Sequence, residues 1–527
     1  MARYITALCG ALVLVTAMVA RPSAQAQTAQ AVLQAVAQAQ GTNTLKCVTY
    51  NGAGYVGMVG QAYDIRDDWP RVELANYSRT LNFEEKSSRE ERVIRQGSYP
   101  PRGGGGIPIQ GEQRVVEFVV DRAAWTLQGA NTMPVPAPAA AEMRQLDMWL
   151  NPHGFVKAAM APGANPVLIT RWESGALGGL SSVPMRRLRI ISFTALGKYR
   201  VNGTINEQNL VERVQTWVPN PVRGDMNYEG EFSQWRDVSG IKFPGNFHHH
   251  QDWDDETQPP NYSGGHNRIT FTVKDVMVNQ CAATPVPEAA RTATVPPVRV
   301  ETTKMGDGVY YLTGGSHHSM AVEFRDFTAL IEAPQDERRT LAVIEAVYKV
   351  IPNKPIRYVV NSHNHFDHLG GIRTAFHEGA TIVTHHSNRE FYKQEVLTYA
   401  ARTLEPDRLS LYPPTEFAEG YQLETVDMRG TISDGTRNLD VYYVQGSPHA
   451  EGMLMAYLPK EKILVEADVY TPPAPDAQMP ATPPPAALNL YNNVMNYKLD
   501  VATIAGLHGR AVPWSDFLRF VGKTGTN

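Results

Sequence analysis

Apolar and polar residues alternate along much of the first half of the chain. Gly, Asn or Pro separate four runs with the two-residue repeat of half-buried strands: residues 113–127, 188–203, 209–219 and 267–279. We therefore expect a mostly antiparallel sheet with few helices. A short helix should precede it at residues 29–40, because Gly41 follows as a helix-ending residue. The Gly- or Pro-rich stretches 101–108 and 134–141 predict loops.

The second half has a different pattern, in which short apolar runs alternate with helical periodicity. The apolar runs predict strands at residues 308–314, 320–324, 328–334, 356–360, 380–385, 439–446 and 462–470. Residues 335–352 predict a helix, with Leu341, Ile344 and Tyr348 at helical spacing and acidic residues in the first turn. Along this half of the chain, predicted helices alternate with the predicted strands, both before and after its middle. We expect an α/β fold in which two sheets pack face to face with helices outside.

The chain of 527 residues is too long for one hydrophobic core, so we expect two domains. Residues 282–297 are rich in Pro, Ala and Thr and have no periodicity, which predicts a linker. It would separate a β-rich N-terminal domain of unknown role, residues 27–281, from a C-terminal domain, residues 298–527.

The first 26 residues have the pattern of a secretory signal peptide. Arg3 precedes a mostly apolar run over residues 5–20, and Ala24 and Ala26 form a small-x-small cleavage site. We expect a mature chain that starts near Gln27 and is exported to the periplasm or beyond; the alternative is an uncleaved membrane anchor. No later stretch reaches the roughly 18 apolar residues of a membrane span.

Export changes the interpretation of the two cysteines that remain, Cys47 and Cys281. In an oxidising compartment they would form a disulfide that closes the N-terminal domain, and the equal alternative is two unrelated buried thiols.

The composition is that of an ordinary globular protein, with 43% hydrophobic and 19% charged residues and a formal charge of −4. No basic block is interleaved with aromatic residues, so nothing indicates a nucleic-acid partner. The composition leaves the oligomeric state open.

The most informative motif is HNHFDH at residues 363–368, which follows an apolar strand and precedes a helical pattern. Such a strand-to-helix loop presents side chains from a rigid scaffold. Imidazole nitrogens and a carboxylate are ligands for zinc and similar divalent ions. Three further residues stand at the ends of apolar runs and would complete the site: His449, Asp468 and His508.

These residues resemble the pattern of the metallo-β-lactamase superfamily in order and rough spacing, over about residues 300–515. The resemblance implies an αββα sandwich and two metal ions, Zn²⁺ or alternatively iron or manganese. It assigns His363, His365 and His449 to the first metal. It assigns Asp367, His368 and His508 to the second, with Asp468 as a bridging ligand.

The resemblance also implies a reaction on a small-molecule substrate. A hydroxide shared by the metals would attack an ester, thioester, lactone or lactam, with Asp367 as the catalytic residue that orients it. An Asp at position 468 is more similar to the glyoxalase II, lactonase and phosphodiesterase branches than to true β-lactamases. The alternatives are an iron-dependent oxidoreductase of the sulfur dioxygenase type, a β-lactamase, and a binding protein with a vestigial metal site.

Other histidines are weaker candidates. The stretch from His248 onward, HHHQDWDDE, would suit a metal, but we favour a solvated hairpin loop because nothing fixes its spacing. We expect His317 and His318 at the surface, without a metal. His385 and His386 follow a strand and stay ambiguous.

Overall fold

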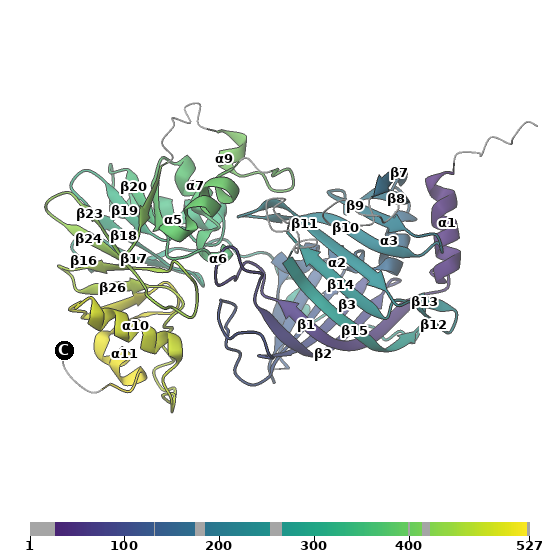
Figure 1. The fold of residues 1–527 in the computed structure, drawn as a ribbon, viewed down its shortest axis with the longest axis horizontal. Coiled ribbons are helices and arrows are strands. Elements are labelled where there is room, and N and C mark those ends of the chain that lie inside the picture. The colour runs from purple at the N-terminus through teal and green to yellow at the C-terminus, as the bar shows by residue number, and fades with distance from the viewer. Residues whose placement is uncertain are drawn as a thin grey trace, which may run out of the picture.

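The structure is a computed structural model. It describes residues 27–130, 132–173, 185–252, 266–398, 401–413 and 422–523. The predicted signal peptide, residues 1–26, lies outside these ranges. Two lobes lie side by side along the long axis of the molecule, and the N-terminal half of the chain forms one of them (Figure 1). No helix in the described ranges is long and apolar enough to cross a membrane.

One 13-stranded sheet dominates the N-terminal lobe, in the order β6-β5-β4-β3-β2-β1-β15-β14-β11-β10-β9-β8-β7. Each strand in this order is antiparallel to its neighbours, as the alternating pattern predicts. The strands are β1 Cys47–Gly57, β2 Arg71–Asn82, β3 Ser87–Arg95, β4 Gln113–Val120, β5 Ala123–Gln128, β6 Val135–Pro136, β7 Val167–Glu173, β8 Arg186–Ala195, β9 Tyr199–Ile205, β10 Val211–Asn220, β11 Gly224–Ser233, β14 Asn246–Gln251 and β15 His266–Val278. A separate pair consists of β12 Arg236–Val238 and β13 Ile241–Phe243.

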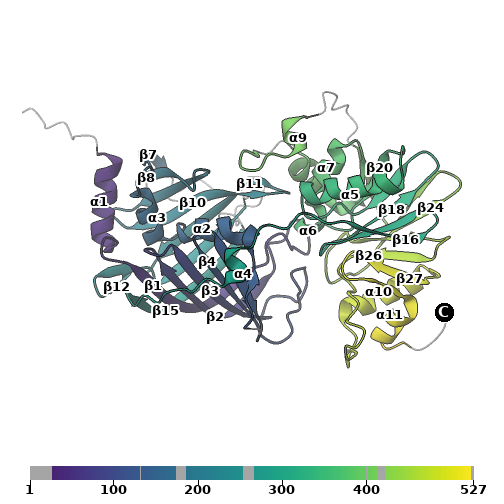
Figure 2. The same cartoon turned by 180° about the vertical axis from the view of Figure 1, so that it is seen from behind.

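Helices and a disulfide complete this lobe. The expected helix is α1, Ala29–Gln40; it ends at Gly41, whose φ of 75° is in the left-handed region. The sequence pattern missed two short helices, α2 Ala141–Met148 and α3 Pro152–Ala159. A 3-10 turn, η1 Pro138–Ala140, leads into α2, which packs against β3, β4 and β5 (Figure 2). The expected disulfide between Cys47 and Cys281 is present, with a Cα–Cα distance of 5.6 Å.

The expected hairpin loop at His248 is wrong. Residues 248–251 belong to β14, which pairs with β11 on one side and β15 on the other. His249 and His250 are both buried, with 7% of their surface exposed. The polar composition of the stretch suggested a loop, but its place inside the sheet buries it. Residues 253–265, which include the acidic end of the stretch, lie outside the described ranges.

The C-terminal lobe has the expected sandwich of two sheets. The first has the order β16-β17-β18-β19-β20-β21-β22, and the second β23-β24-β25-β26-β27-β28. The strands of the first are β16 Glu301–Gly306, β17 Val309–Thr313, β18 Ser319–Glu323, β19 Thr328–Ile331, β20 Ile356–Val360, β21 Thr381–His385 and β22 Leu423–Val426. Those of the second are β23 Arg429–Ser433, β24 Asn438–Tyr443, β25 Leu454–Leu458, β26 Ile463–Glu466, β27 Thr503–Gly506 and β28 Ala511–Pro513.

Helices cover the outer faces of this sandwich, which gives the αββα layers. They are α5 Glu337–Val350, α6 Phe366–Leu369, α7 Ile372–His377, α8 Arg389–Phe391, α9 Arg408–Leu411, α10 Pro485–Asn496 and α11 Trp514–Phe520, with the irregular turns η2 His386–Asn388 and η3 Tyr392–Val396. Helices α5 and α7 pack on the first sheet, and α10 and α11 on the second. The buried side of α5 is centred on Val343 and Val347, whereas Tyr348 is 41% exposed.

Residues 282–297 connect the lobes and contain one short helix, α4 Glu288–Arg291, which the linker pattern did not indicate. The exact domain limits stay a prediction. The two lobes contact each other in several regions. At one, Arg402 donates to the carbonyls of residues 220–222, and Asp225 accepts from Thr403. At another, the β1–β2 and β3–β4 loops contact the HNHFDH segment.

Candidate metal centre

All seven residues that the sequence singled out come together at one end of the C-terminal sandwich. His363 and His365 follow β20, and Asp367 and His368 lie in α6. The other three stand after the ends of strands in the second sheet: His449 after β24, Asp468 after β26 and His508 after β27. In both sheets these loops leave the same edge, so the side chains converge although the segments are far apart in sequence.

Two groups of donor atoms form there, each with its ligand atoms within 4.8 Å of one another. The first group contains His363, His365, His449 and Asp468. In it, Nε2 of His363 lies 2.9 Å from Nδ1 of His365 and 3.3 Å from Nε2 of His449. Three ring nitrogens at such distances, on largely buried side chains, form a pocket for one cation.

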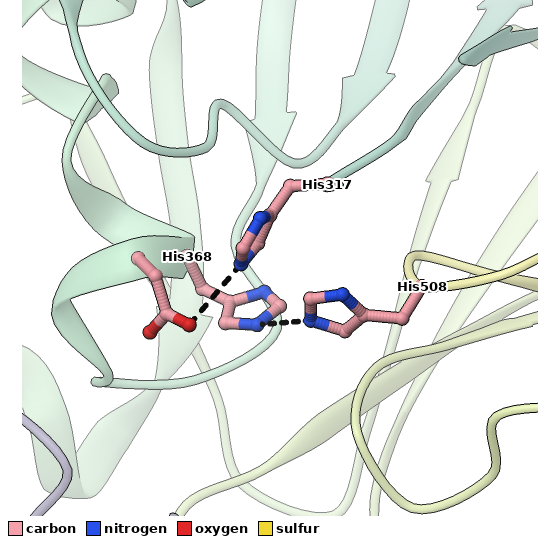
Figure 3. Close-up of side chains that lie close together, drawn as sticks. His317, His368 and His508 are labelled. Carbon is pink, nitrogen blue, oxygen red and sulfur yellow. Dashed lines mark hydrogen bonds and ion pairs between the residues drawn. The ribbon is translucent and has the colours of Figure 1, made fainter. Parts of the chain in front are cut away.

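The second group contains Asp367, His368 and His508, and it also contains His317. Nε2 of His508 lies 3.1 Å from Nε2 of His368, and Nε2 of His317 lies 3.1 Å from Oδ2 of Asp367. Figure 3 shows the three histidines of this group directed toward one another, with the carboxylate beside them.

Asp468 connects the two groups. Its Oδ2 lies 3.2 Å from Nε2 of His363 and 2.7 Å from Nε2 of His368, and its Oδ1 lies 2.9 Å from Nε2 of His508. The residue has a φ of 59°, in the left-handed region that Asp and Asn adopt more readily than most other residues.

Hydrogen bonds behind the ring nitrogens orient the histidines. Nδ1 of His368 donates to the buried carboxylate of Glu332 at 3.0 Å, and Nδ1 of His508 donates to the carbonyl of Ser316 at 3.0 Å. Each bond fixes the tautomer and leaves Nε2 free to face the group. The side-chain amide of Asn361 donates a hydrogen bond of 2.6 Å to the other carboxylate oxygen of Glu332.

The N-terminal lobe also supplies hydrogen-bond partners to the candidate ligands. The sequence did not reveal these contacts. Nε2 of His365 donates to the carbonyl of Ala62 at 3.0 Å, so its Nδ1 faces the first group. The amide nitrogen of Gln61 donates to Oδ1 of Asp367 at 2.8 Å, and its oxygen accepts from the backbone N–H of Gly105 at 2.8 Å. Both residues lie in the β1–β2 loop, at separations of 306 and 303 residues from Asp367 and His365.

One signal in the sequence was available for this contact. A Cβ added to Gly104 would lie 2.0 Å from Oε1 of Gln61 and 2.6 Å from Cε1 of His365, so the glycine backbone approaches the site too closely for any side chain. A run of glycines such as residues 103–106 often marks such a close approach. We interpreted that run only as a loop.

The expected surface position of His317 is wrong. The residue is 8% exposed, and it belongs to the second group. The β17–β18 loop folds over the sheet edge, where the N–H of His318 bonds the carbonyl of Leu507 at 2.8 Å. His318 is also buried, at 6% exposed, and bonds the hydroxyl of Tyr311 instead. His385 and His386 belong to neither group.

Electrostatics favour ligation by His363 and Asp468. Burial, reinforced by the neighbouring His368, lowers the pKa of His363 to about 4, so its imidazole is neutral at neutral pH. Burial opposes ionisation of Asp468, but His368 and His449 outweigh it and hold the pKa of that carboxyl well below its usual range. Neutral imidazoles and an ionised carboxylate are the forms that bind metal. His368 must lose a proton to bind metal, because burial lowers its pKa but the carboxylates of Asp468 and Glu332 outweigh burial and raise the pKa well above its usual range.

Comparisons with known proteins agree with the C-terminal architecture. Residues 312–468 match the profile of the metallo-beta-lactamase superfamily. No curated protein matches the chain. Among solved structures, a metallo-beta-lactamase from Pontibacter korlensis is similar, with 18% identity and a TM-score of 0.32 over 42% of this chain and 98% of its own.

Two other solved structures are also similar to part of the chain. The metallo-beta-lactamase FIM-1 from Pseudomonas aeruginosa in the mono-zinc form has 19% identity and a TM-score of 0.32, over 43% of this chain and 96% of its own. Rubredoxin oxygen:oxidoreductase from Desulfovibrio gigas has 16% identity and a TM-score of 0.31, over 42% and 61%. The family match therefore assigns residues 312–468 to the metallo-beta-lactamase superfamily, and the candidate metal-binding His/Asp groups lie in the same lobe.

Proposed function

We propose that the protein is a dinuclear metal-dependent hydrolase that acts on an ester, thioester, lactone or lactam. The position of Asp468 carries this proposal, because its two oxygens reach both donor groups. A carboxylate that spans two cation pockets suits a pair of metals better than one metal.

The donor set fits two divalent ions. Imidazole nitrogens and carboxylate oxygens suit zinc, and iron or manganese would also accept them. His363, His365 and His449 would hold one ion, Asp367, His368 and His508 the other, and Asp468 would contact both. His317 is a further candidate for the second ion. When bound, two such ions would lower the pKa of a shared water toward neutrality and polarise the substrate carbonyl.

The residues of this chain have separate roles in such a reaction. Gln61 holds Oδ1 of Asp367, which leaves Oδ2 directed at the second group. Asp367 would accept a hydrogen bond from the attacking water and orient it. Glu332 and Ala62 keep His368 and His365 in the tautomers that ligation needs. The β1–β2 loop would also restrict access of water and substrate.

The proposal has a defined test. Purified protein loaded with zinc would be assayed against a lactone, a thioester, a β-lactam and a phosphodiester, with His363→Ala as the inactive reference. We expect turnover of an acyl substrate and a requirement for metal. Preferential turnover of the β-lactam would establish the β-lactamase alternative, and no turnover of any substrate would contradict hydrolysis.

A second candidate is an iron-dependent oxidoreductase of the sulfur dioxygenase type, because the same histidine and carboxylate donors also suit iron. Metal analysis of protein purified without added metal separates the two. Iron together with oxygen uptake in the presence of a thiol substrate would favour the oxidoreductase, whereas zinc without oxygen uptake would favour the hydrolase.

We further propose that the protein is exported, on the basis of the apolar run at residues 5–20 and the Ala24-x-Ala26 site. The disulfide between Cys47 and Cys281 supports an oxidising compartment. Mass spectrometry of the native protein should give an N-terminus near Gln27. A soluble product that still begins with Met1 would contradict export by cleavage.

A further inference from the structure

A cavity that is partly open to solvent lies in the N-terminal lobe. Its volume is about 430 Å³, within the usual range for sites of small molecules. It is lined by residues of the 13-stranded sheet and of α2, such as Tyr77, Phe247 and Met143. None of the residues that line it belongs to either donor group of the metal centre.

Aromatic rings form much of the wall. Phe247 stacks on Phe271 with 4.7 Å between ring centroids and an interplanar angle of 12°, and Tyr50 stacks on Phe247 at 5.4 Å and 10°. Tyr77 lies 4.5 Å from Phe271. A row of nearly parallel rings along one wall suits a flat apolar body.

Most of the charges in the cavity neutralise one another. Three arginines face three acids, and each arginine has an ionic partner: Arg79 with Asp147 at 2.5 Å, Arg92 with Glu90 at 3.5 Å and Arg144 with Glu117 at 2.8 Å. Arg268 also lines the cavity, but no carboxylate in the described ranges pairs with it. Within the described part of the chain, its guanidinium donates a hydrogen bond only to the carbonyl of Gly57, at 3.5 Å. The cavity therefore has one positive charge without a counterion among the described residues.

His249 supplies a second unsatisfied group. It is 7% exposed, and its Nδ1 lies 2.7 Å from the hydroxyl of Tyr228. Its Nε2 is buried and has no hydrogen-bond partner among the described residues. Burial lowers the pKa of His249 to about 3 and raises that of Tyr228, so the ring is neutral and the phenol keeps its proton. In the tautomer in which Tyr228 donates to Nδ1, Nε2 of His249 carries the hydrogen. A buried donor without an acceptor is destabilising.

We propose that this cavity is a binding site for a small aromatic carboxylate. The carboxylate pairs with Arg268 and accepts a hydrogen bond from Nε2 of His249, while the ring lies against Phe247 and Phe271. This site would be independent of the metal centre and goes beyond the hydrolase function proposed above. It gives the N-terminal lobe a role of its own in small-molecule recognition.

The test uses the full chain and two probes of the same shape, 1-naphthoate and the uncharged 1-naphthamide. The protein is first treated with a chelator, because carboxylates also bind metal ions and would give a false signal at the metal centre. In isothermal titration calorimetry we expect 1-naphthoate to bind at one site per chain, and the amide to bind at least tenfold more weakly. Equal binding of acid and amide, or no binding of the acid, would overturn the proposal.

Variants then test whether 1-naphthoate binds in this cavity. We expect Arg268→Gln to weaken 1-naphthoate binding about tenfold or more, the usual effect of losing a hydrogen bond to a charged group. His249→Phe should weaken it by a smaller factor and leave amide binding nearly unchanged. Arg122→Gln, which removes an exposed arginine of the same lobe outside the cavity, is the control. If Arg268→Gln binds the acid as tightly as the native chain does, the assignment of this cavity is wrong.

Discussion

The amide nitrogen of Gln61 donates a hydrogen bond of 2.8 Å to Oδ1 of Asp367, across 306 residues of chain. A residue of the N-terminal lobe thus contacts the carboxylate that the metallo-beta-lactamase motif contributes. The same loop supplies the carbonyl that fixes His365. Both lobes therefore contribute contacts to the candidate metal centre.

The first prediction concerns this contact. Gln61→Ala should lower hydrolysis about tenfold or more, because removal of an outer partner of a ligand typically has effects of this size. Gln61→Glu should lower it further, since a second carboxylate would face Asp367. Gln110→Ala, an exposed glutamine of the neighbouring β3–β4 loop, is the control. Unchanged kcat and KM in both Gln61 variants would show that the contact has no role in the reaction.

The second prediction concerns the carboxylate of Asp468, which lies between the two donor groups. Asp468→Ala should leave roughly half of the metal and reduce turnover about a hundredfold or more, because both donor groups lose a shared anion. Metal content by mass spectrometry and hydrolysis rate are measured on the same preparation. Asp476→Ala, at an exposed position of the Pro-rich segment, should behave as the native protein. Two tightly bound metals and normal turnover in Asp468→Ala would contradict the dinuclear mechanism.

The third prediction concerns His317, which the sequence alone placed at the surface. Its Nε2 is 3.1 Å from Oδ2 of Asp367, inside the second donor group. His317→Ala should therefore weaken the second metal about tenfold or more and change the visible spectrum of Co²⁺-substituted protein. The exposed His386→Ala is the matched control. If the His317 variant has the native Co²⁺ spectrum and metal affinity, the residue is not a ligand.

The fourth prediction concerns pH and the N-terminal lobe. Burial lowers the pKa of His153 to about 4, from 6.5 in an unfolded chain, and Nδ1 bonds Thr42 at 2.8 Å. Below pH 6.5 the unfolded state gains a proton that the folded state does not accept, so stability falls as the pH falls toward 4. The contribution of this histidine should drop by about 2 kcal/mol between pH 7 and pH 5.

Thermal unfolding of native protein and His153→Gln across that range measures this effect. The stability of the variant should depend less steeply on pH, because Gln does not titrate. Identical pH dependence in the two proteins would show that His153 does not take up the proton on unfolding.

The sequence by itself determined the seven residues of the HNHFDH, His449, Asp468 and His508 pattern, and it predicted the sheets that present them. These features are local. A strand follows from alternation or an apolar run within about eight residues, and HNHFDH places four donors on one loop. The antiparallel N-terminal sheet and the αββα sandwich were predictable for the same reason.

Only the tertiary structure decided which other residues join the site. His317 became buried because the β17–β18 loop folds over the sheet edge, and residues 248–251 became part of β14 because β11 and β15 pair with it on both sides. Gln61 and Ala62 reach the motif because the two lobes pack against each other. Each of these contacts joins segments far apart in the chain, so no local pattern of apolar and polar residues records it.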